Sequence, residues 1–194
     1  MSRGRASTIR HLGGGRILRS GGDPEREARI MALARAAGYP VPLVFDVRPD
    51  ALVLERVEGP TMAGSLARRP WLARRHMTTL ARLHDRLHSI PLNGASLLHL
   101  DLHPENVLMS PSGPVVIDWT NARPGASETD VALTWLIMRT SAGLPGRMLA
   151  SLFARRVGLA QVRRGIAAAA SFRLADPHVT DAERSHVLAV IGHR

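Results

Sequence analysis

Up to residue 55, hydrophobic residues occur in short runs, and this pattern predicts four strands and one helix. Residues 7–12 and 16–19 flank three glycines, which predicts a β-hairpin. Residues 25–37 carry apolar side chains at helical spacing and end before a glycine. The apolar runs at 42–47 and 51–54 suit buried strands. The predicted order is therefore strand, strand, helix, strand, strand.

From residue 61 onward the apolar spacing becomes helical, most clearly over residues 71–87. A capping box formed by Thr180 and Glu183 marks the start of the last helix. The helices predicted for the C-terminal third lie at 128–141, 147–156, 159–172 and 181–191. The change of pattern at Gly59 and Pro60 predicts two parts in an α+β fold, residues 1–58 and residues 59–194.

The composition is that of a folded protein. Of 194 residues, 45% are hydrophobic and 22% are charged, so one compact domain or two small lobes can bury a core. Cysteine is absent, which excludes disulfides and thiolate metal sites. The longest apolar stretch, residues 131–138, is too short to span a bilayer, and no apolar run follows the first charges. We therefore expect a soluble cytoplasmic protein without membrane contact.

The chain is strongly basic, with 26 − 16 = +10 formal charges, and every basic residue is arginine. Because lysine is absent throughout, a global preference for arginine explains part of this charge. Arginine pairs at 68/69, 74/75, 155/156 and 163/164 could form a nucleic-acid patch. Aromatic residues make up only 4% and no recognition motif accompanies the pairs. A solvated surface is the favoured interpretation, and nucleic acid is not expected as a partner.

Residues 97–119 hold most of the polar residues that suggest chemistry. A hairpin with a three-residue turn would pair residue 110 with 114 and place Asn106 opposite Asp118. Paired side chains in such a ladder lie roughly 5 Å apart. Their oxygens, with Asp101 five residues upstream, suit Mg²⁺. The alternative is a turn-rich loop in which these side chains cap backbone amides.

The spacing His-x-Asp-x-x-x-x-Asn, followed by a hairpin and a second Asp, is the one described for the catalytic loops of protein kinases. This assigns Asp101 as the catalytic base and Asn106 with Asp118 as metal ligands. His99 is interpreted as structural support of the loop. For His103, support of the loop and a contact with substrate remain equal alternatives.

These residues resemble the aminoglycoside phosphotransferase and choline kinase-like family, on the segments 99–108 and 115–119. The resemblance extends from about residue 17 to residue 135 and also covers 17–19, Glu27 in a helix, 53–59 and 130–132. The resemblance implies a two-lobed protein-kinase-like fold, with a small β-rich N-lobe and a mainly helical C-lobe. It also implies ATP-dependent, Mg²⁺-dependent transfer of a phosphoryl group to a hydroxyl of a small molecule.

The resemblance also implies roles for individual residues outside the catalytic loop. Arg19 would touch the α- and β-phosphates, with Glu27 as its ion-pair partner. Glu55 and Val57 would offer backbone groups to adenine, and Asp130 would hold the catalytic loop.

The family normally has another strand and a glycine-rich phosphate loop before the first hairpin, whereas here only residues 3–7 precede it. The alternative function is therefore a pseudokinase-like module that binds a nucleotide or a partner without transfer. The glycines at 13–15 favour a plain turn over a phosphate cradle, because no helix follows them.

Two further expectations concern metal and acceptor. His84 and His88 stand four residues apart on a helix, which fits zinc, but no third ligand is evident and an arginine-rich surface helix explains them better. Residues 120–194 carry ten arginines and five acids, or 10 − 5 = +5. Because such a surface repels polycations, we expect a neutral or anionic hydroxyl compound rather than an aminoglycoside.

Overall fold

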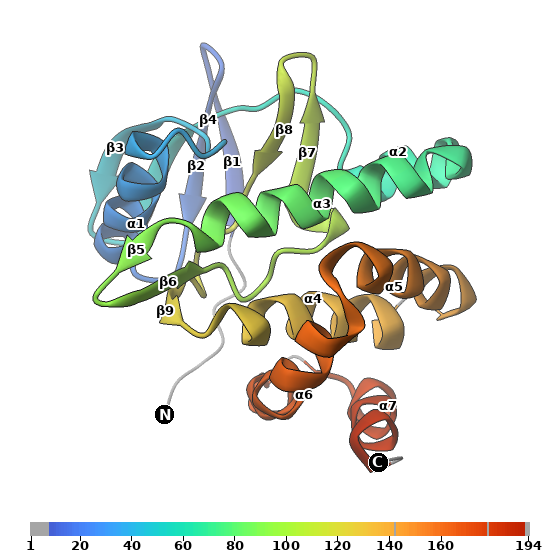
Figure 1. Ribbon diagram of the computed structural model, residues 1–194. Helices are drawn as coiled ribbons and strands as arrows, with labels where there is room; N and C mark the ends of the chain where they lie inside the picture. Colours follow the sequence, from blue (N-terminus) through green and yellow to red (C-terminus); the bar gives the residue numbers. More distant parts are fainter. Residues whose placement is uncertain (1–7, 142, 178, 193–194) are drawn as a thin grey trace.

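The computed structural model describes residues 8–141, 143–177 and 179–192. The N-terminal part is a four-stranded antiparallel sheet in the order β1-β2-β4-β3 (Figure 1). Its strands are β1 (Thr8–Gly13), β2 (Arg16–Ser20), β3 (Val44–Arg48) and β4 (Ala51–Glu55). Helix α1 (Pro24–Ala36) lies between β2 and β3 in sequence and packs against β3 and β4. The predicted order of elements is confirmed.

Burial differs sharply across this sheet. Strand β4 is buried along nearly its whole length, whereas every residue of the edge strand β1 is exposed. Asp23 caps α1 by accepting a hydrogen bond from the Arg26 amide, and this fixes the start of the helix. Met31 and Ala34 of α1 then pack into the core, while Glu27 on the same helix is also buried. A buried carboxylate on α1 requires a partner.

After the sheet, the chain enters the helical part through a tight junction at Gly59. A Cβ atom at this position would lie 2.3 Å from the Met109 carbonyl oxygen, so only glycine fits. The Met109 amide donates to the Pro60 carbonyl at 2.8 Å, which ties the junction to a later hairpin. The helices that follow are α2 (Met62–Arg68), the short 3₁₀ helix η1 (Pro70–Leu72) and α3 (Ala73–His88).

Two small sheets hold the polar segment between α3 and the last helices. The first contains β5 (Pro91–Leu92), β6 (Ala95–Leu98) and β9 (Arg123–Gly125), and the second contains β7 (Val107–Ser110) and β8 (Gly113–Val116). The 3₁₀ helix η2 (Pro104–Asn106) leads into β7. The pattern analysis did not anticipate β5 or β9, which are only two and three residues long.

The predicted register of the β7–β8 hairpin is wrong by one residue. Ser110 pairs with Gly113 across a two-residue turn, and not with Pro114. The left-handed φ of Gly113 (126°) and a hydrogen bond from the Ser110 hydroxyl to the Gly113 carbonyl favour this shorter turn. Asn106 consequently lies opposite Ile117, whose amide donates to the Asn106 carbonyl at 3.0 Å. Asp118 is therefore not the direct cross-strand partner of Asn106.

All the helices predicted for the C-terminal third are present. They are α4 (Ser127–Ser141), α5 (Gly143–Val157), α6 (Leu159–Leu174) and α7 (Asp181–Gly192). Helix α4 packs between α5 and α6, and Gly165 allows the close approach because a Cβ atom there would lie 1.9 Å from the Glu128 carbonyl oxygen. Thr180 caps α7 as predicted, but the Glu183 carboxylate pairs with Arg173. Among the described residues, no helix has the length and apolar character needed to cross a bilayer.

Candidate active site

The catalytic loop begins directly after β6 and is held from below by Asp130 of α4. The amides of His99 and Leu100 donate to the two carboxylate oxygens of Asp130, at 3.1 and 2.7 Å. Leu100 adopts a left-handed backbone with φ of 59°, which costs a non-glycine residue about 1–2 kcal/mol. The hydrogen bond to Asp130 offsets this cost. Asp130 thus contacts the loop as the sequence resemblance implies.

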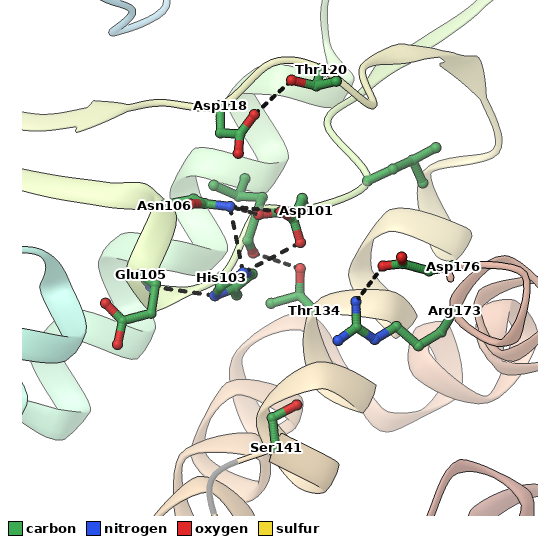
Figure 2. A network of polar contacts seen from close by, with 12 residues as sticks. Asp101, His103, Glu105, Asn106, Asp118, Thr120, Thr134, Ser141, Arg173 and Asp176 are labelled. Carbon is green, nitrogen blue, oxygen red and sulfur yellow. Dashed lines mark hydrogen bonds and ion pairs between the residues drawn. The ribbon is translucent and has the colours of Figure 1, made fainter. Parts of the chain in front are cut away.

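Each carboxylate oxygen of Asp101 contacts a neighbouring side chain (Figure 2). The Asn106 side-chain amide donates to the carbonyl oxygen of Asp101 and to its Oδ2, each at 2.9 Å. On the other side, Nε2 of His103 lies 3.3 Å from Oδ1. These contacts fix the orientation of a half-buried carboxylate at the mouth of the loop.

The charge state of Asp101 follows from its neighbours. Burial opposes ionisation, but the hydrogen bond and the charge of His103 outweigh it, so the pKa of Asp101 lies below its ordinary value of 3.8. Arg173, at the end of α6, acts in the same direction. Asp101 is therefore a carboxylate at neutral pH and can accept a hydrogen bond from a hydroxyl group.

Asp118 follows the β7–β8 hairpin in a strained conformation. Its φ of 62° is left-handed, and its Oδ1 accepts a hydrogen bond from the Thr120 hydroxyl at 2.8 Å. The next residue, Trp119, is completely buried and donates its indole N–H to the Val116 carbonyl at 3.0 Å. In the view of Figure 2, a carboxylate oxygen of Asp118 is directed toward Asn106 and Asp101.

Arg19 and Glu27 form the predicted ion pair, and it connects the N-terminal sheet to the segment after Asp118. Both side chains are buried, at 6% and 3% exposure. Arg19 also donates to the Thr120 hydroxyl at 3.3 Å, while Glu27 accepts from the Trp119 amide at 3.3 Å. Burial raises the pKa of Glu27 above its ordinary value of 4.5, with the Arg19 charge opposing and the Asp118 charge adding to the effect. Glu27 is thus attracted by the charge of Arg19 and repelled by the charge of Asp118.

The sequence analysis missed a second cation in this network. Arg26, one residue before Glu27, donates to the Thr120 carbonyl at 3.2 Å and also to the Ala122 carbonyl. No spacing rule in the sequence could reveal this, because the partners lie more than ninety positions away. Arg173 was also missed; it pairs with Asp176 (Figure 2) and with Glu183.

The donor atoms around the loop fit a magnesium ion. Because the Asn106 amide nitrogen is occupied by Asp101, the carboxamide oxygen points to the opposite side. Within residues 8–141, 143–177 and 179–192, neither that oxygen nor Oδ2 of Asp118 accepts a hydrogen bond. Two hard oxygen donors without protein partners are what Mg²⁺ requires beside phosphate oxygens. Nε of Arg19, buried without a partner, adds a donor for a phosphate group.

The other two residues assigned to the nucleotide lie at the end of the sheet. The Glu55 side chain accepts from the Leu43 amide at 3.0 Å, and the Glu55 amide donates to the Leu43 carbonyl at 2.8 Å. Val57 follows β4 and is half-buried. In the part of the chain that the structure describes, no hydrogen bond involves the Val57 backbone, so its amide and carbonyl are available to a ligand.

The two histidines of the loop have different surroundings. His99 is fully buried against the Trp119 ring, with ring centroids 4.9 Å apart, which suits a structural role. His103 contacts Asp101, and its Nδ1 accepts from the Glu105 amide at 3.4 Å. Both nitrogens of His103 thus face the loop itself, and this favours support over a substrate contact.

The prediction that His84 and His88 belong to a surface helix is wrong. His84 is completely buried and only 9% of the His88 side chain is exposed. Both face Asp130 across the contact between α3 and α4. The arginines of α3 lie on another, exposed face of the helix. The helical periodicity of the sequence did not show that the histidines and the arginines lie on different faces.

Two of the arginine pairs noted in the sequence converge in space. Arg74, Arg155 and Arg156 line, together with Leu152, a surface cavity of about 250 Å³. The helices α3 and α5 that carry them pack against each other. The favoured interpretation as a solvated surface stays a prediction.

The fold and the candidate site have the arrangement of kinase-like phosphotransferases: a small antiparallel sheet joined to a helical part, with a loop that carries Asp101 and Asn106. Residues 93–169 match the sequence model of the phosphotransferase enzyme family. This segment contains the catalytic loop, the hairpin and helix α4. The family resemblance expected from the sequence is therefore confirmed.

Solved structures support the same fold. A thermostable mutant of aminoglycoside phosphotransferase APH(4)-Ia superposes with a TM-score of 0.70 at 18% identity, covering 100% of this chain and 93% of that one. A choline/ethanolamine kinase family protein from Mesorhizobium loti gives 0.63 at 14% identity, covering 97% and 89%. The ADP-bound aminoglycoside phosphotransferase APH(2'')-Ib gives 0.65 at 11% identity, covering 97% and 90%. The two-lobed, protein-kinase-like α+β fold is confirmed.

Curated relatives with sequence similarity come from archaea. A probable serine/threonine-protein kinase BUD32 homolog of Archaeoglobus fulgidus is 31% identical over 93 residues, which are 48% of this chain and 42% of the relative. A probable bifunctional tRNA threonylcarbamoyladenosine biosynthesis protein of Methanoculleus marisnigri is 32% identical over 93 residues, 48% of this chain and 16% of the relative. The chain thus spans less than half the length of these relatives.

Proposed function

We propose that this protein is a phosphotransferase that moves the γ-phosphoryl group of ATP to a hydroxyl group of a small molecule, in a Mg²⁺-dependent reaction. One observation carries the proposal. The Asn106 side-chain nitrogen donates to Asp101, so the carboxamide oxygen of Asn106 points away from Asp101, and a carboxylate oxygen of Asp118 is directed toward Asn106 (Figure 2). This arrangement supports Asp101 as the proposed base and Asn106 with Asp118 as the proposed metal ligands.

In the proposed reaction, Asp101 orients the acceptor hydroxyl and takes its proton. The acceptor oxygen forms a bond to the γ-phosphorus, the bond from that phosphorus to the bridging oxygen breaks, and ADP leaves with the electron pair. Because the pKa of Asp101 is lowered, its main contribution is orientation, with proton transfer late in the step. Mg²⁺ held by Asn106 and Asp118 would neutralise phosphate charge.

The nucleotide would bind where the sheet meets the helical part. Arg19 would donate to the α- and β-phosphates, and Glu27 would keep its guanidinium in position. The unpaired backbone groups of Val57, with the neighbouring Glu55, would contact adenine. The ADP-bound structural neighbour supports nucleotide binding in this fold.

For the acceptor, we propose a neutral or anionic compound rather than a polyamine. The C-terminal residues 120–194 carry ten arginines against five acids. Arg173 acts electrostatically on Asp101, although Asp176 and Glu183 partly neutralise it. A polycation would need local carboxylates to overcome the remaining repulsion.

A second candidate acceptor is a serine or threonine hydroxyl of a protein. The observation that favours it is the match to a relative named as a probable serine/threonine-protein kinase. The catalytic machinery would be unchanged, since Asp101 would orient a side-chain hydroxyl in the same way. The two candidates differ only in the surface that presents the acceptor.

The proposal is tested by ATP consumption against panels of neutral sugars, anionic hydroxylated metabolites, kanamycin-like polyamines and unstructured proteins. Mg²⁺-dependent turnover of a neutral or anionic compound is expected. Turnover of proteins alone would favour the second candidate, and efficient turnover of a polyamine that falls with rising salt would contradict the proposed acceptor class. Mg²⁺-dependent ATP binding without any transfer would identify the pseudokinase-like alternative.

A further inference from the structure

Two histidines and one aspartate meet beneath the catalytic loop, at the contact between α3 and α4. One ligand atom from each of His84, His88 and Asp130 lies within 4.8 Å of the other two. Nε2 of His88 is 2.9 Å from Oδ2 of Asp130, and Nδ1 of His84 is 3.6 Å from the same oxygen. The third ligand that the sequence did not reveal is thus supplied by α4.

The hydrogen bonds of Thr134 determine which nitrogen of His84 carries the proton. The Thr134 hydroxyl lies 2.7 Å from the Leu102 carbonyl oxygen, which can only accept, so Thr134 uses its single hydrogen there. Nε2 of His84 lies 3.0 Å from the same hydroxyl oxygen and must therefore be the donor. In a neutral His84, Nδ1 then carries a lone pair.

That lone pair faces a carboxylate oxygen inside the protein. His84 is 0% exposed, and its Nδ1 has no hydrogen-bond partner. The Asp130 charge is also fully buried, and the groups that donate to it are neutral amides and a histidine N–H. Two facing lone pairs repel each other, and a buried anion is costly without a counter-charge. A cation placed between them would remove both costs.

The donor set suits a transition-metal ion. Two imidazole nitrogens and one carboxylate oxygen are typical zinc ligands, and tetrahedral geometry with Zn–ligand bonds of about 2.0–2.1 Å separates ligand atoms by about 3.3–3.4 Å. The two observed separations, 3.6 and 2.9 Å, lie on either side of that value. His84 donates its other ring N–H to Thr134, which is the arrangement that orients metal-binding histidines.

We propose that His84, His88 and Asp130 form a binding site for Zn²⁺ or a chemically similar divalent transition-metal ion. Three protein ligands leave a fourth position for water. His88, with 9% of its side chain exposed, lies on the route from solvent. This site is separate from the Mg²⁺ ligands Asn106 and Asp118 and does not depend on the proposed reaction.

Metal binding here would act on the catalytic loop through Asp130. The same carboxylate accepts the amides of His99 and Leu100. An ion that fixes Asp130 would therefore stabilise the base of the loop, and the folded protein as a whole, because the unfolded chain does not present this site.

The test begins with the full chain stripped by a chelator and titrated calorimetrically with Zn²⁺, with Co²⁺ as a spectroscopic substitute. The parent should bind one equivalent at this site, show the visible absorption of tetrahedral Co²⁺, and melt at a higher temperature with Zn²⁺. His84→Gln and His88→Gln should each lose that equivalent and the thermal shift. His76→Gln is the matched control, because His76 is buried on the same helix but contacts Ser65.

Thr134→Val keeps the metal ligands and removes only the hydroxyl that orients His84, so it should weaken Zn²⁺ binding about 10- to 100-fold. This variant keeps the proposal testable if the histidine variants fail to fold. Absence of Zn²⁺ binding by the parent would overturn the proposal. A loss of Zn²⁺ binding in His76→Gln as large as that in the His84 and His88 variants would also overturn it. If NMR detected a doubly protonated His84 in chelator near neutral pH, a proton on Nδ1 would face Asp130 in place of a metal ion, and the proposal would be overturned.

Discussion

The two sides of the catalytic loop have opposite physical character. Toward the proposed reactants, Asp101, Asn106 and Asp118 are half-buried, and within the described residues the Asn106 carboxamide oxygen and Oδ2 of Asp118 accept no hydrogen bond. Toward the interior, Asp130 and His99 are fully buried, and both oxygens of Asp130 accept loop amides. The comparison shows that the Asp130 carboxylate holds the loop backbone from the interior, while Asp101 lies on the other side of the loop, where the proposed reaction needs it.

The largest effect is expected on the reactant side. Asp101→Asn keeps the size of the side chain but removes the charge that orients the acceptor hydroxyl, so turnover should fall about 10²- to 10⁴-fold. ATP affinity should stay unchanged, because Asp101 is not assigned to the nucleotide. Turnover and calorimetric ATP binding measured on one preparation check both statements.

The control for this variant is Glu105→Gln in the same loop, where the exposed carboxylate accepts from the Thr61 hydroxyl. It should retain most of the activity. If Asp101→Asn turned over as fast as the parent, the assignment of the base would be wrong.

On the interior side, the effect should appear as lost stability. Asp130→Ala leaves the His99 and Leu100 amides without acceptors, and each orphaned buried donor costs about 1–3 kcal/mol. We expect the free energy of unfolding to fall by about 3 kcal/mol or more in urea titrations. Asp85→Ala, at an exposed position of α3, should change it by less than about 0.5 kcal/mol. Similar losses in both variants would contradict the role of Asp130.

Much of this two-sided architecture could be predicted from the sequence. The alternation of short apolar runs gave the order of the N-terminal strands and of α1, because local periodicity reports which face is buried. The spacing of Asp101 and Asn106 placed both residues in one short loop, and the structure shows them in contact there.

What the sequence could not give depends on contacts between distant elements. The turn after Ser110 differs by one residue from the predicted turn, because the Gly113 backbone permits a tighter turn than the pattern suggested. The burial of His84 follows from the packing of α3 on α4, which helical periodicity does not specify. The same holds for Arg26, whose carbonyl partners are remote in the chain.

A smaller effect on stability and on ATP affinity is expected at the buried ion pair between Arg19 and Glu27. Glu27→Gln removes the counter-charge of the buried Arg19 while keeping the side-chain size. A hydrogen bond to a charged group contributes about 1.5–3 kcal/mol, so stability should drop within that range and ATP affinity should weaken about tenfold. Thermal unfolding and ATP calorimetry measure the two effects. Glu25→Gln, exposed in the same helix, should change neither, and an equal response in both would refute the ion pair's role.

The smallest expected effect is a pH dependence of stability that comes from the histidines buried on the interior side of the loop. Burial lowers the pKa of His84 and of His99 below the ordinary 6.5. The folded protein then binds these protons less tightly than the unfolded chain, so the related stability is present above pH 6.5 and is lost as pH falls below it. Each group contributes at most about 1.4 kcal/mol per pH unit.

Urea midpoints recorded from pH 8 to pH 5.5 in chelator should therefore decrease, and His84→Gln should flatten the curve. The carboxylate of Asp130 does not interfere in this window, because its interactions with His84 and His88 outweigh the effect of burial and hold its pKa well below 3.8. Stability that rises toward pH 5.5 would show that the histidines are charged in the folded state.

The most direct test of the central claim is the Mg²⁺ dependence of ATP binding. Calorimetry of the parent should show tight ATP binding only with Mg²⁺, and Asp118→Ala should remove that dependence because one of the two ligand oxygens is gone. Asp46→Ala, in the exposed strand β3, should bind ATP and Mg²⁺ as the parent does. Equal ATP affinity of the parent with and without Mg²⁺ would contradict the assignment of Asn106 and Asp118 as metal ligands and, with it, the proposed reaction.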